Sequence, residues 1–231
     1  MKTIGIIGGM SFESTATYYK SINEEVAKKL GGLNSAKIVL YSLNFEEIAA
    51  LQERGDWDGA ARILGEAARK LEAAGAHFLL IATNTMHKIY DSIQAQVKIP
   101  ILHIALSTAA ALKEAGIKKI GLLGTKFTMS EDFYIKILSE QGIETLTPSE
   151  ADMQEVSGII FSELCKGQIK EKSKEKYLQI IQKLQLIGAE AIVLGCTEIG
   201  LLLKSSDTKI PLFDTCIIHS KNAAKIALDD Q

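Results

Sequence analysis

The chain has 231 residues, of which 47% are hydrophobic and 23% charged, a composition typical of a soluble protein with a packed core. Its 26 Lys and Arg residues nearly balance its 28 Asp and Glu residues, and the net charge of −2 gives no general attraction to nucleic acid or to an anionic membrane. No apolar run has the length of a membrane span or of a secretory signal. We therefore expect neither a nucleic-acid nor a membrane partner.

Short apolar runs alternate with segments of helical periodicity along the whole chain. Runs that are apolar on both faces are typical of strands in a parallel sheet that helices cover on both sides. In chain order, strands are predicted at 4–7, 37–41, 78–81, 120–123 and 191–194. Helices are predicted at 14–30, 59–74, 104–114, 131–140, 153–165, 175–187 and 217–228, with a charged surface connection at 166–174. Capping-box spacing marks Asn44 with Glu47 and Thr128 with Glu131 as helix starts.

Three segments recur in the same order in the two halves of the chain. Gly8 pairs with Gly124, Thr83 with Cys196 and Pro100 with Pro211, at offsets of 116, 113 and 111 residues. Three collinear matches predict an α/β fold of two pseudo-symmetric halves, each a doubly wound parallel sheet flanked by helices. We place the halves at 1–100 and 101–214, and we expect 215–231 to pack back on the first half.

The three cysteines, Cys165, Cys196 and Cys216, have no CxxC spacing and form no cluster with histidine in the sequence. An odd number of cysteines without an export signal favours free thiols in a reducing compartment. We therefore predict a cytoplasmic protein without a structural zinc site.

Polar residues follow four of the predicted strands, where ligands of open parallel sheets bind. The four segments are Gly8-Gly9-Met10-Ser11, Thr83-Asn84-Thr85, the stretch 124–128 and Cys196-Thr197-Glu198. If the halves pack face to face, these strand ends converge on one cleft, with Thr83 and Cys196 on opposite walls. Neither GxGxxG nor GxxxxGK[ST] occurs, which argues against dinucleotide and phosphate-loop binding.

Cys196 is the strongest single candidate for chemistry. A thiol between a strand end and a helix N-terminus is expected to have a lowered pKa and to be thiolate near neutral pH. Cys165 and Cys216 fit inert packing positions on helices. Glu198 either assists a ligand ammonium group or complements the helix dipole, and His87 either orients a neighbour or is a buried helix residue.

Two basic residues are candidates for a ligand carboxylate. Arg54, in the polar segment 52–57, has the planar guanidinium that suits bidentate binding, or it lies on a solvated loop. Lys166, beside Gly167, either contacts a ligand or caps the C-terminal end of a helix.

The segments Gly8-Gly9-Met10-Ser11, Asn84-Thr85-Met86-His87 and Gly195-Cys196-Thr197-Glu198-Ile199 resemble the aspartate/glutamate racemase family, in particular its aspartate racemase branch. The resemblance covers essentially the whole chain. It implies a cofactor-independent, usually dimeric enzyme in which two thiols act on opposite faces of the amino-acid α-carbon, with no metal. Cys196 matches the second catalytic cysteine, whereas Thr83 stands where the first is expected. Because a threonine hydroxyl is no standing base at neutral pH, we expect slow or one-sided racemisation.

The resemblance also implies the residues that bind an acidic amino acid. Those expected around the substrate are Met10, Ser11, Asn84, Thr85, Thr125, Thr197 and Glu198. Gln52 or Arg54 would approach the side-chain carboxylate, with Lys166 as the weaker candidate.

The sequence leaves other functions open. A decarboxylase of a malonate, an isomerase of a small diacid or a hydantoin racemase would use the same strand-end cysteine. From a different class, a non-catalytic binder of acidic amino acids would have lost its first cysteine. A phosphate- or nucleotide-binding protein is the least supported, because both loop patterns are missing. The choice between aspartate and glutamate is open as well.

Overall fold

The computed structural model describes residues 1–229 and divides them into two compact units. Among the described residues, the first unit consists of residues 1–103 and 219–229, and the second of residues 104–218. The sequence analysis places the boundaries at 100/101 and 214/215, a few residues earlier in both cases. Residues 230 and 231, part of the segment expected to return to the first half, lie outside the described residues.

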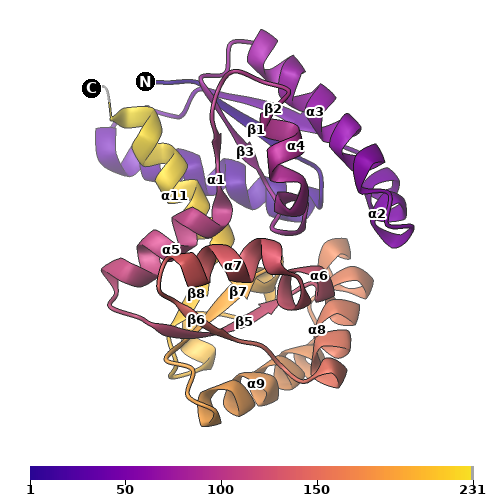
Figure 1. The fold of residues 1–231 in the computed structure, drawn as a ribbon. Coiled ribbons are helices and arrows are strands. Elements are labelled where there is room, and N and C mark those ends of the chain that lie inside the picture. The colour runs from indigo at the N-terminus through magenta and orange to yellow at the C-terminus, as the bar shows by residue number, and fades with distance from the viewer. Residues whose placement is uncertain (230–231) are drawn as a thin grey trace. The chain divides into compact units, whose positions relative to one another are not determined.

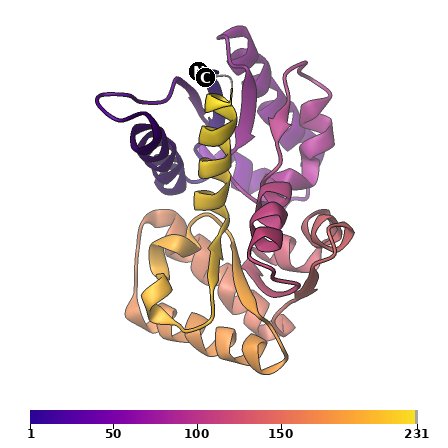
Figure 2. The ribbon, with the colours of Figure 1, turned by 90° about the vertical axis from the view of Figure 1, so that its left-hand side faces the viewer.

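A four-stranded parallel sheet in the order β2-β1-β3-β4 forms the centre of the first unit (Figure 1). Its strands are β1 (Ile4–Gly8), β2 (Ile38–Ser42), β3 (Phe78–Ile81) and β4 (Ile101–Leu102). The helices of this unit are α1 (Phe12–Leu30), α2 (Phe45–Glu53), α3 (Trp57–Ala73), the 3-10 helix η1 (Thr85–Ile89) and α4 (Tyr90–Gln94). The last helix, α11 (Thr215–Leu228), joins α1 on one face of the sheet, and α3 and α4 cover the other (Figure 2).

The second unit repeats this topology, with a parallel sheet in the order β6-β5-β7-β8. Its strands are β5 (Lys119–Gly124), β6 (Glu144–Leu146), β7 (Ala191–Gly195) and β8 (Leu212–Asp214). Its helices are α5 (Ile104–Glu114), α6 (Lys126–Ser130), α7 (Asp132–Glu140), α8 (Glu150–Ser162), η2 (Leu164–Lys166), α9 (Glu171–Leu186), α10 (Ile199–Leu202) and η3 (Ser205–Asp207). The matching strand orders confirm the predicted pair of parallel, helix-flanked sheets.

Strand burial explains why the apolar runs form central strands. All residues of β1, β3 and β7 are buried, and each of these strands is paired on both sides. Each unit has its own apolar core between sheet and helices. Burying one Leu or Ile side chain contributes about 1.5–3 kcal/mol, so these runs stabilise the fold most where they are covered on both faces.

Several local predictions need correction. The strands β4, β6 and β8 are too short, at two or three residues, to stand out as apolar runs. The capping pair of Thr128 with Glu131 is wrong: Thr125 is the N-cap of α6, and Glu131 makes no side-chain capping bond to α7. Asn44 does cap α2, and its side chain also donates to Glu47.

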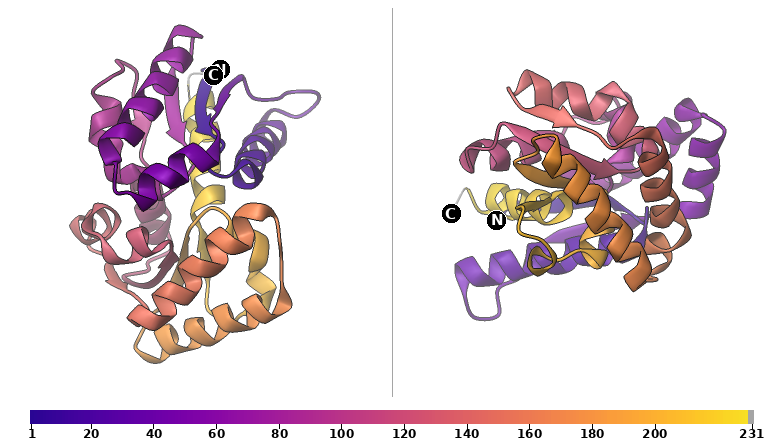
Figure 3. Two further views of the ribbon diagram at one scale, coloured as in Figure 1. Left: turned by 90° about the vertical axis from the view of Figure 1, so that its right-hand side faces the viewer. Right: turned by 90° about the horizontal axis from the view of Figure 1, so that it is seen from below.

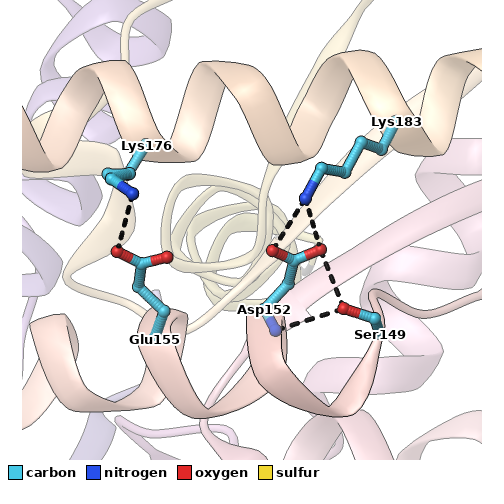
Figure 4. A network of polar contacts seen from close by, with 5 residues as sticks. All are labelled: Ser149, Asp152, Glu155, Lys176 and Lys183. Carbon is cyan, nitrogen blue, oxygen red and sulfur yellow. Dashed lines mark hydrogen bonds and ion pairs between the residues drawn. The ribbon is translucent and has the colours of Figure 1, made fainter.

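Helices α8 and α9 lie side by side in the second unit and are joined by ion pairs (Figures 3 and 4). Lys183 Nζ lies 2.9 Å from both carboxylate oxygens of Asp152, and Lys176 Nζ lies 3.4 Å from Glu155 Oε1. Ser149 caps α8 and also donates to Asp152 at 2.9 Å. The Lys183 contact is the main reason why the pKa of Asp152 is lowered.

The longest helix among the described residues is α1, with 19 residues, and only part of one face of it is buried. In the part of the chain that the structure describes, no helix combines the length and the apolar character needed to cross a bilayer.

Candidate functional site

The turn that follows β1 is held tightly against the end of β2. Gly9 has a φ of +87°, and a Cβ atom there would lie 2.2 Å from the carbonyl oxygen of Leu43. Thr15 Oγ1 accepts from the Gly9 N–H at 2.8 Å and donates to the Ser11 carbonyl at 2.7 Å. Met10 and Ser11 are buried, and the Ser11 side chain is the N-cap of α1. The predicted ligand turn is thus a fixed element of the first unit.

The Thr83 turn follows the neighbouring strand β3 in the same unit. The Ala82 N–H still donates to Ile7 of β1, at 2.9 Å, so the chain leaves the sheet at Thr83. His87 fixes the turn through two hydrogen bonds. Its backbone N–H donates to Asn84 O at 3.0 Å, and the Nδ1 atom of its imidazole lies 2.8 Å from Thr83 O. Thr83, Asn84 and Thr85 are all buried. Only a five-residue 3-10 helix, η1, follows this turn.

The structure separates the two candidates for the side-chain carboxylate that lie in the first unit. Gln52 is in the last turn of α2, is 6% exposed, and its Nε2 donates to Met86 Sδ at 3.0 Å. Arg54 is exposed beyond the end of the same helix. The structure therefore brings Gln52, and not Arg54, against the segment that follows Thr83.

Cys196 follows the buried strand β7 of the second unit and is hydrogen-bonded to an acidic residue. Its Sγ donates to Glu198 Oε2 at 2.9 Å, and Thr197 Oγ1 donates to the same oxygen at 3.0 Å. All three residues are buried, Glu198 with only 2% of its surface exposed. A thiol and a hydroxyl thus converge on one carboxylate oxygen at the strand end.

The expectation of a lowered Cys196 pKa is wrong for the free protein. Burial, which disfavours the charged thiolate, raises this pKa well above its ordinary value, and the Glu198 carboxylate raises it further. The helix that follows, α10, has only four residues, so its dipole opposes these effects weakly. Cys196 is therefore a neutral thiol whose proton points at a carboxylate.

The other cysteines occupy packing positions. Cys165, in η2, is half-buried against the core of the second unit, and burial also raises its pKa. Cys216 is fully buried in α11. The three cysteines form no disulfide bond with one another.

Two further predicted residues of the second unit differ in their surroundings. Thr125 caps α6 directly after β5, and Gly124 of that strand is paired in register with Gly195, the residue before Cys196. Thr125 and Cys196 therefore leave the sheet at neighbouring positions. Lys166 is exposed at the end of η2, beside Gly167 in the left-handed conformation, as expected for the end of a helix.

The sequence analysis missed three titratable residues next to the strand ends, of which two histidines are buried and one aspartate is partly buried. His103 directly follows β4, Asp214 is the last residue of β8, and His219 lies on α11. Burial lowers the pKa of His103 to about 4 and that of His219 to about 3, and it raises the pKa of Asp214 to about 6. The repeat contains a signal for two of them, because His103 and Asp214 stand at equivalent positions after the two Lys-Ile-Pro segments.

Among residues 1–229, no group of three or more His, Cys, Asp or Glu side chains is placed to hold a metal ion. Thr83 belongs to the first unit and Cys196 to the second.

A family model described as Asp/Glu/Hydantoin racemase matches residues 7–223, nearly the whole chain and both units. The chain belongs to this family. The match confirms the resemblance seen in the three sequence segments, and it makes the chain an isomerase of the amino-acid racemase type.

Individual proteins with racemase names are similar to this chain over nearly the full length of both chains. A Yersinia pestis protein, provisionally described as an Asp/Glu racemase, has a crystal structure with a TM-score of 0.90, 50% identity, and coverage of 99% of this chain and 100% of that one. An aspartate racemase homologue from Pyrococcus horikoshii OT3 matches with a TM-score of 0.84 and 38% identity, over 98% of this racemase-family chain and 99% of its own. The broad specificity amino-acid racemase RacX of Bacillus subtilis is 26% identical over 97% of this chain and 98% of its own.

Proposed function

We propose that this racemase-family member interconverts the enantiomers of an acidic amino acid, aspartate or glutamate, without a cofactor. Cys196 exchanges a proton with one face of the substrate α-carbon, and Thr83 serves the opposite face. The observation that carries the proposal is the bond from the Cys196 thiol to the buried Glu198 carboxylate, at the end of a central strand. The names of the Yersinia and Pyrococcus relatives support an acidic substrate.

Glu198 solves the difficulty that a neutral thiol is a poor base. As the substrate approaches, the S–H bond breaks and its proton moves to Glu198 Oε2, which lies 2.9 Å away. The thiolate then takes the α-proton and leaves a carbanion beside the substrate carboxylate. Thr197 donates to the same oxygen and so keeps Glu198 oriented. The negative charge thereby moves from the Glu198 carboxylate to the sulfur, and no additional charge is created in the buried site, where charge is costly.

Thr83 is the weaker of the two proposed acid/base groups. Its hydroxyl is too weak an acid to stand ionised, but it can return a proton to a carbanion that is far more basic. Thr83 occupies the position in the first half of the repeat that Cys196 occupies in the second. We therefore expect α-proton exchange to start more readily from the enantiomer whose α-proton faces Cys196.

The surroundings of the candidate residues within each unit support an assignment of the substrate-binding residues. We assign the side-chain carboxylate to Gln52, because it is buried against Met86 whereas Arg54 is exposed. The residues proposed for the rest of the substrate are Met10, Ser11, Asn84, Thr85, Thr125 and Thr197, with Lys166 as an outer residue. The homodimer, the cytoplasmic location and the absence of a cofactor stay predictions from the sequence.

The test is proton NMR of L- and D-aspartate and of L- and D-glutamate in deuterated buffer, followed by chiral separation. We expect loss of the α-proton signal with inversion for at least one pair. A panel of non-acidic amino acids tests whether this protein also has the broad specificity that the name of the Bacillus relative states. Binding of an acidic amino acid without exchange would identify a binder instead, and release of carbon dioxide from a malonate would identify a decarboxylase.

A Thr83→Cys variant tests the second position. A thiol there is a far better acid and base than a hydroxyl, so inversion should become faster and less one-sided. Equal and fast turnover of both enantiomers by the unaltered protein would contradict the proposed asymmetry.

A further inference from the structure

Three histidines from different parts of the first unit come together behind the Thr83 turn. The rings of His87 and His103 are 4.6 Å apart between centroids, and those of His87 and His219 are 6.2 Å apart. Tyr90 of α4 stacks on His87, at 6.2 Å with an interplanar angle of 10°, and also contacts His103 at 4.7 Å. All three imidazoles are buried. The His87 ring is therefore enclosed by residues from α4, the end of β4 and α11.

Hydrogen bonds to backbone carbonyls fix which nitrogen carries the proton. His219 Nε2 lies 3.0 Å from Leu102 O and must donate to it, which leaves Nδ1 to accept from Tyr18 OH at 2.9 Å. By the same reasoning, His87 Nδ1, 2.8 Å from Thr83 O, carries the proton, and Nε2 is the acceptor nitrogen. The cluster thus defines one tautomer of His87.

The surroundings also keep these rings neutral. Burial is the main cause of the strongly lowered pKa of His87, and the neighbouring His103 and His219 lower it further. The phenols of Tyr18 of α1 and Tyr90 of α4 face the cluster, and the carboxylate of Asp91 of α4 raises the pKa of His103, although less than burial lowers it. The three imidazoles therefore carry no positive charge near neutral pH.

We propose that His87 is a positioning residue, whose Nδ1–H bond to the Thr83 carbonyl fixes the backbone of that residue and so aims its hydroxyl. The proposal rests on the proposed function, in which Thr83 returns a proton to the substrate. The backbone of a residue sets the direction of its Cα–Cβ bond. A fixed carbonyl at Thr83 therefore fixes the direction in which the Thr83 side chain leaves the backbone. The second bond, from the backbone N–H of His87 to Asn84 O, holds the next residue of the same turn.

The test compares His87→Phe, which keeps a ring and loses the donor, with His87→Asn, whose amide can donate from a place close to that of Nδ1. His77→Asn is the matched control, because His77 is exposed and bonded to Thr3 N at 3.1 Å, away from the turn. Two rates are measured in deuterated buffer: inversion, which needs both faces, and α-proton exchange of the enantiomer that faces Cys196, which needs one.

We expect His87→Phe to slow inversion on the order of tenfold to a hundredfold and to leave the exchange rate within about twofold. His87→Asn should recover most of the inversion rate, and His77→Asn should have no effect. In a Thr83→Ala background, His87→Phe should cause no further loss, because the group that it positions is missing. Unchanged inversion in a folded His87→Phe protein, or a parallel loss of inversion and exchange, would overturn the proposal.

NMR of the nitrogen-15-labelled protein gives a readout that does not depend on activity. We expect the His87 Nδ1 to be protonated, and the Asn84 amide signal, which senses the Thr83 carbonyl, to move in His87→Phe and to return in His87→Asn. An Nε2-protonated ring, or an Asn84 signal that stays in place in His87→Phe, would overturn the proposal. If the unaltered protein inverts no amino acid, the proposed function fails, whereas these spectra still decide whether His87 holds Thr83.

Discussion

Gly9 and Gly55 provide a matched pair for testing how the turn after β1 is built. Both have positive φ values, +87° and +68°, so alanine at either position pays the left-handed penalty of about 1 kcal/mol. A Cβ atom at Gly55 would meet nothing within 4 Å. At Gly9 it would lie 2.2 Å from the oxygen and 2.5 Å from the nitrogen of Leu43, both backbone atoms. These atoms have little freedom to move, because the Leu43 N–H donates to Gly8 O at 3.0 Å.

Forcing such an overlap adds about 1–3 kcal/mol to the conformational penalty. We therefore expect Gly9→Ala to lower the free energy of unfolding by about 3 kcal/mol, and Gly55→Ala by about 1 kcal/mol. Urea unfolding of the two variants beside the unaltered protein measures both values. Equal losses would show that the close approach to Leu43 does not constrain the turn.

Two further predictions concern titratable residues. Glu198→Gln removes a charge that raises the pKa of Cys196, so the Cys196 thiolate should form at lower pH, as measured by ultraviolet absorbance in a Cys165→Ser background. The same change should slow α-proton exchange, because the thiol loses its proton acceptor. An unchanged thiol titration would contradict the assigned contact. Because burial lowers the pKa of His103 from 6.5 to about 4, the unfolded chain binds a proton that the folded one excludes, and stability should fall as the pH drops below 6.5. The expected slope is about 1.4 kcal/mol per pH unit for this residue, down to a pH of about 4. Urea unfolding over this range should show a shallower slope in His103→Gln, and equal slopes in the two proteins would refute the reasoning.

The fold could be predicted from the sequence where burial is complete. The runs at 4–7, 78–81 and 191–194 are apolar on both faces, and they form strands that are paired on both sides. Three of the four edge strands, β4, β6 and β8, gave no such signal. They have only two or three residues, all of which except Ile101 are at least partly exposed, and β8 ends in a carboxylate, Asp214.

The strand-end segments could be predicted because glycine, threonine and cysteine stand at equivalent places in the repeat. The protonation state of Cys196 could not, because it depends on how deeply the thiol is buried and on where the Glu198 carboxylate points, and spacing alone reveals neither. The histidine cluster was hidden for a related reason: His87, His103 and His219 are separated by up to 132 residues, and only the folded unit brings them together.

The most direct test of the account is solvent-deuterium exchange at the substrate α-carbon by Cys196→Ser, with Cys165→Ser as the control thiol of the same unit. The account predicts that Cys196→Ser abolishes both exchange and inversion of aspartate and glutamate, and that Cys165→Ser keeps both. Exchange that survives in Cys196→Ser would contradict the central claim that this thiol moves the α-proton.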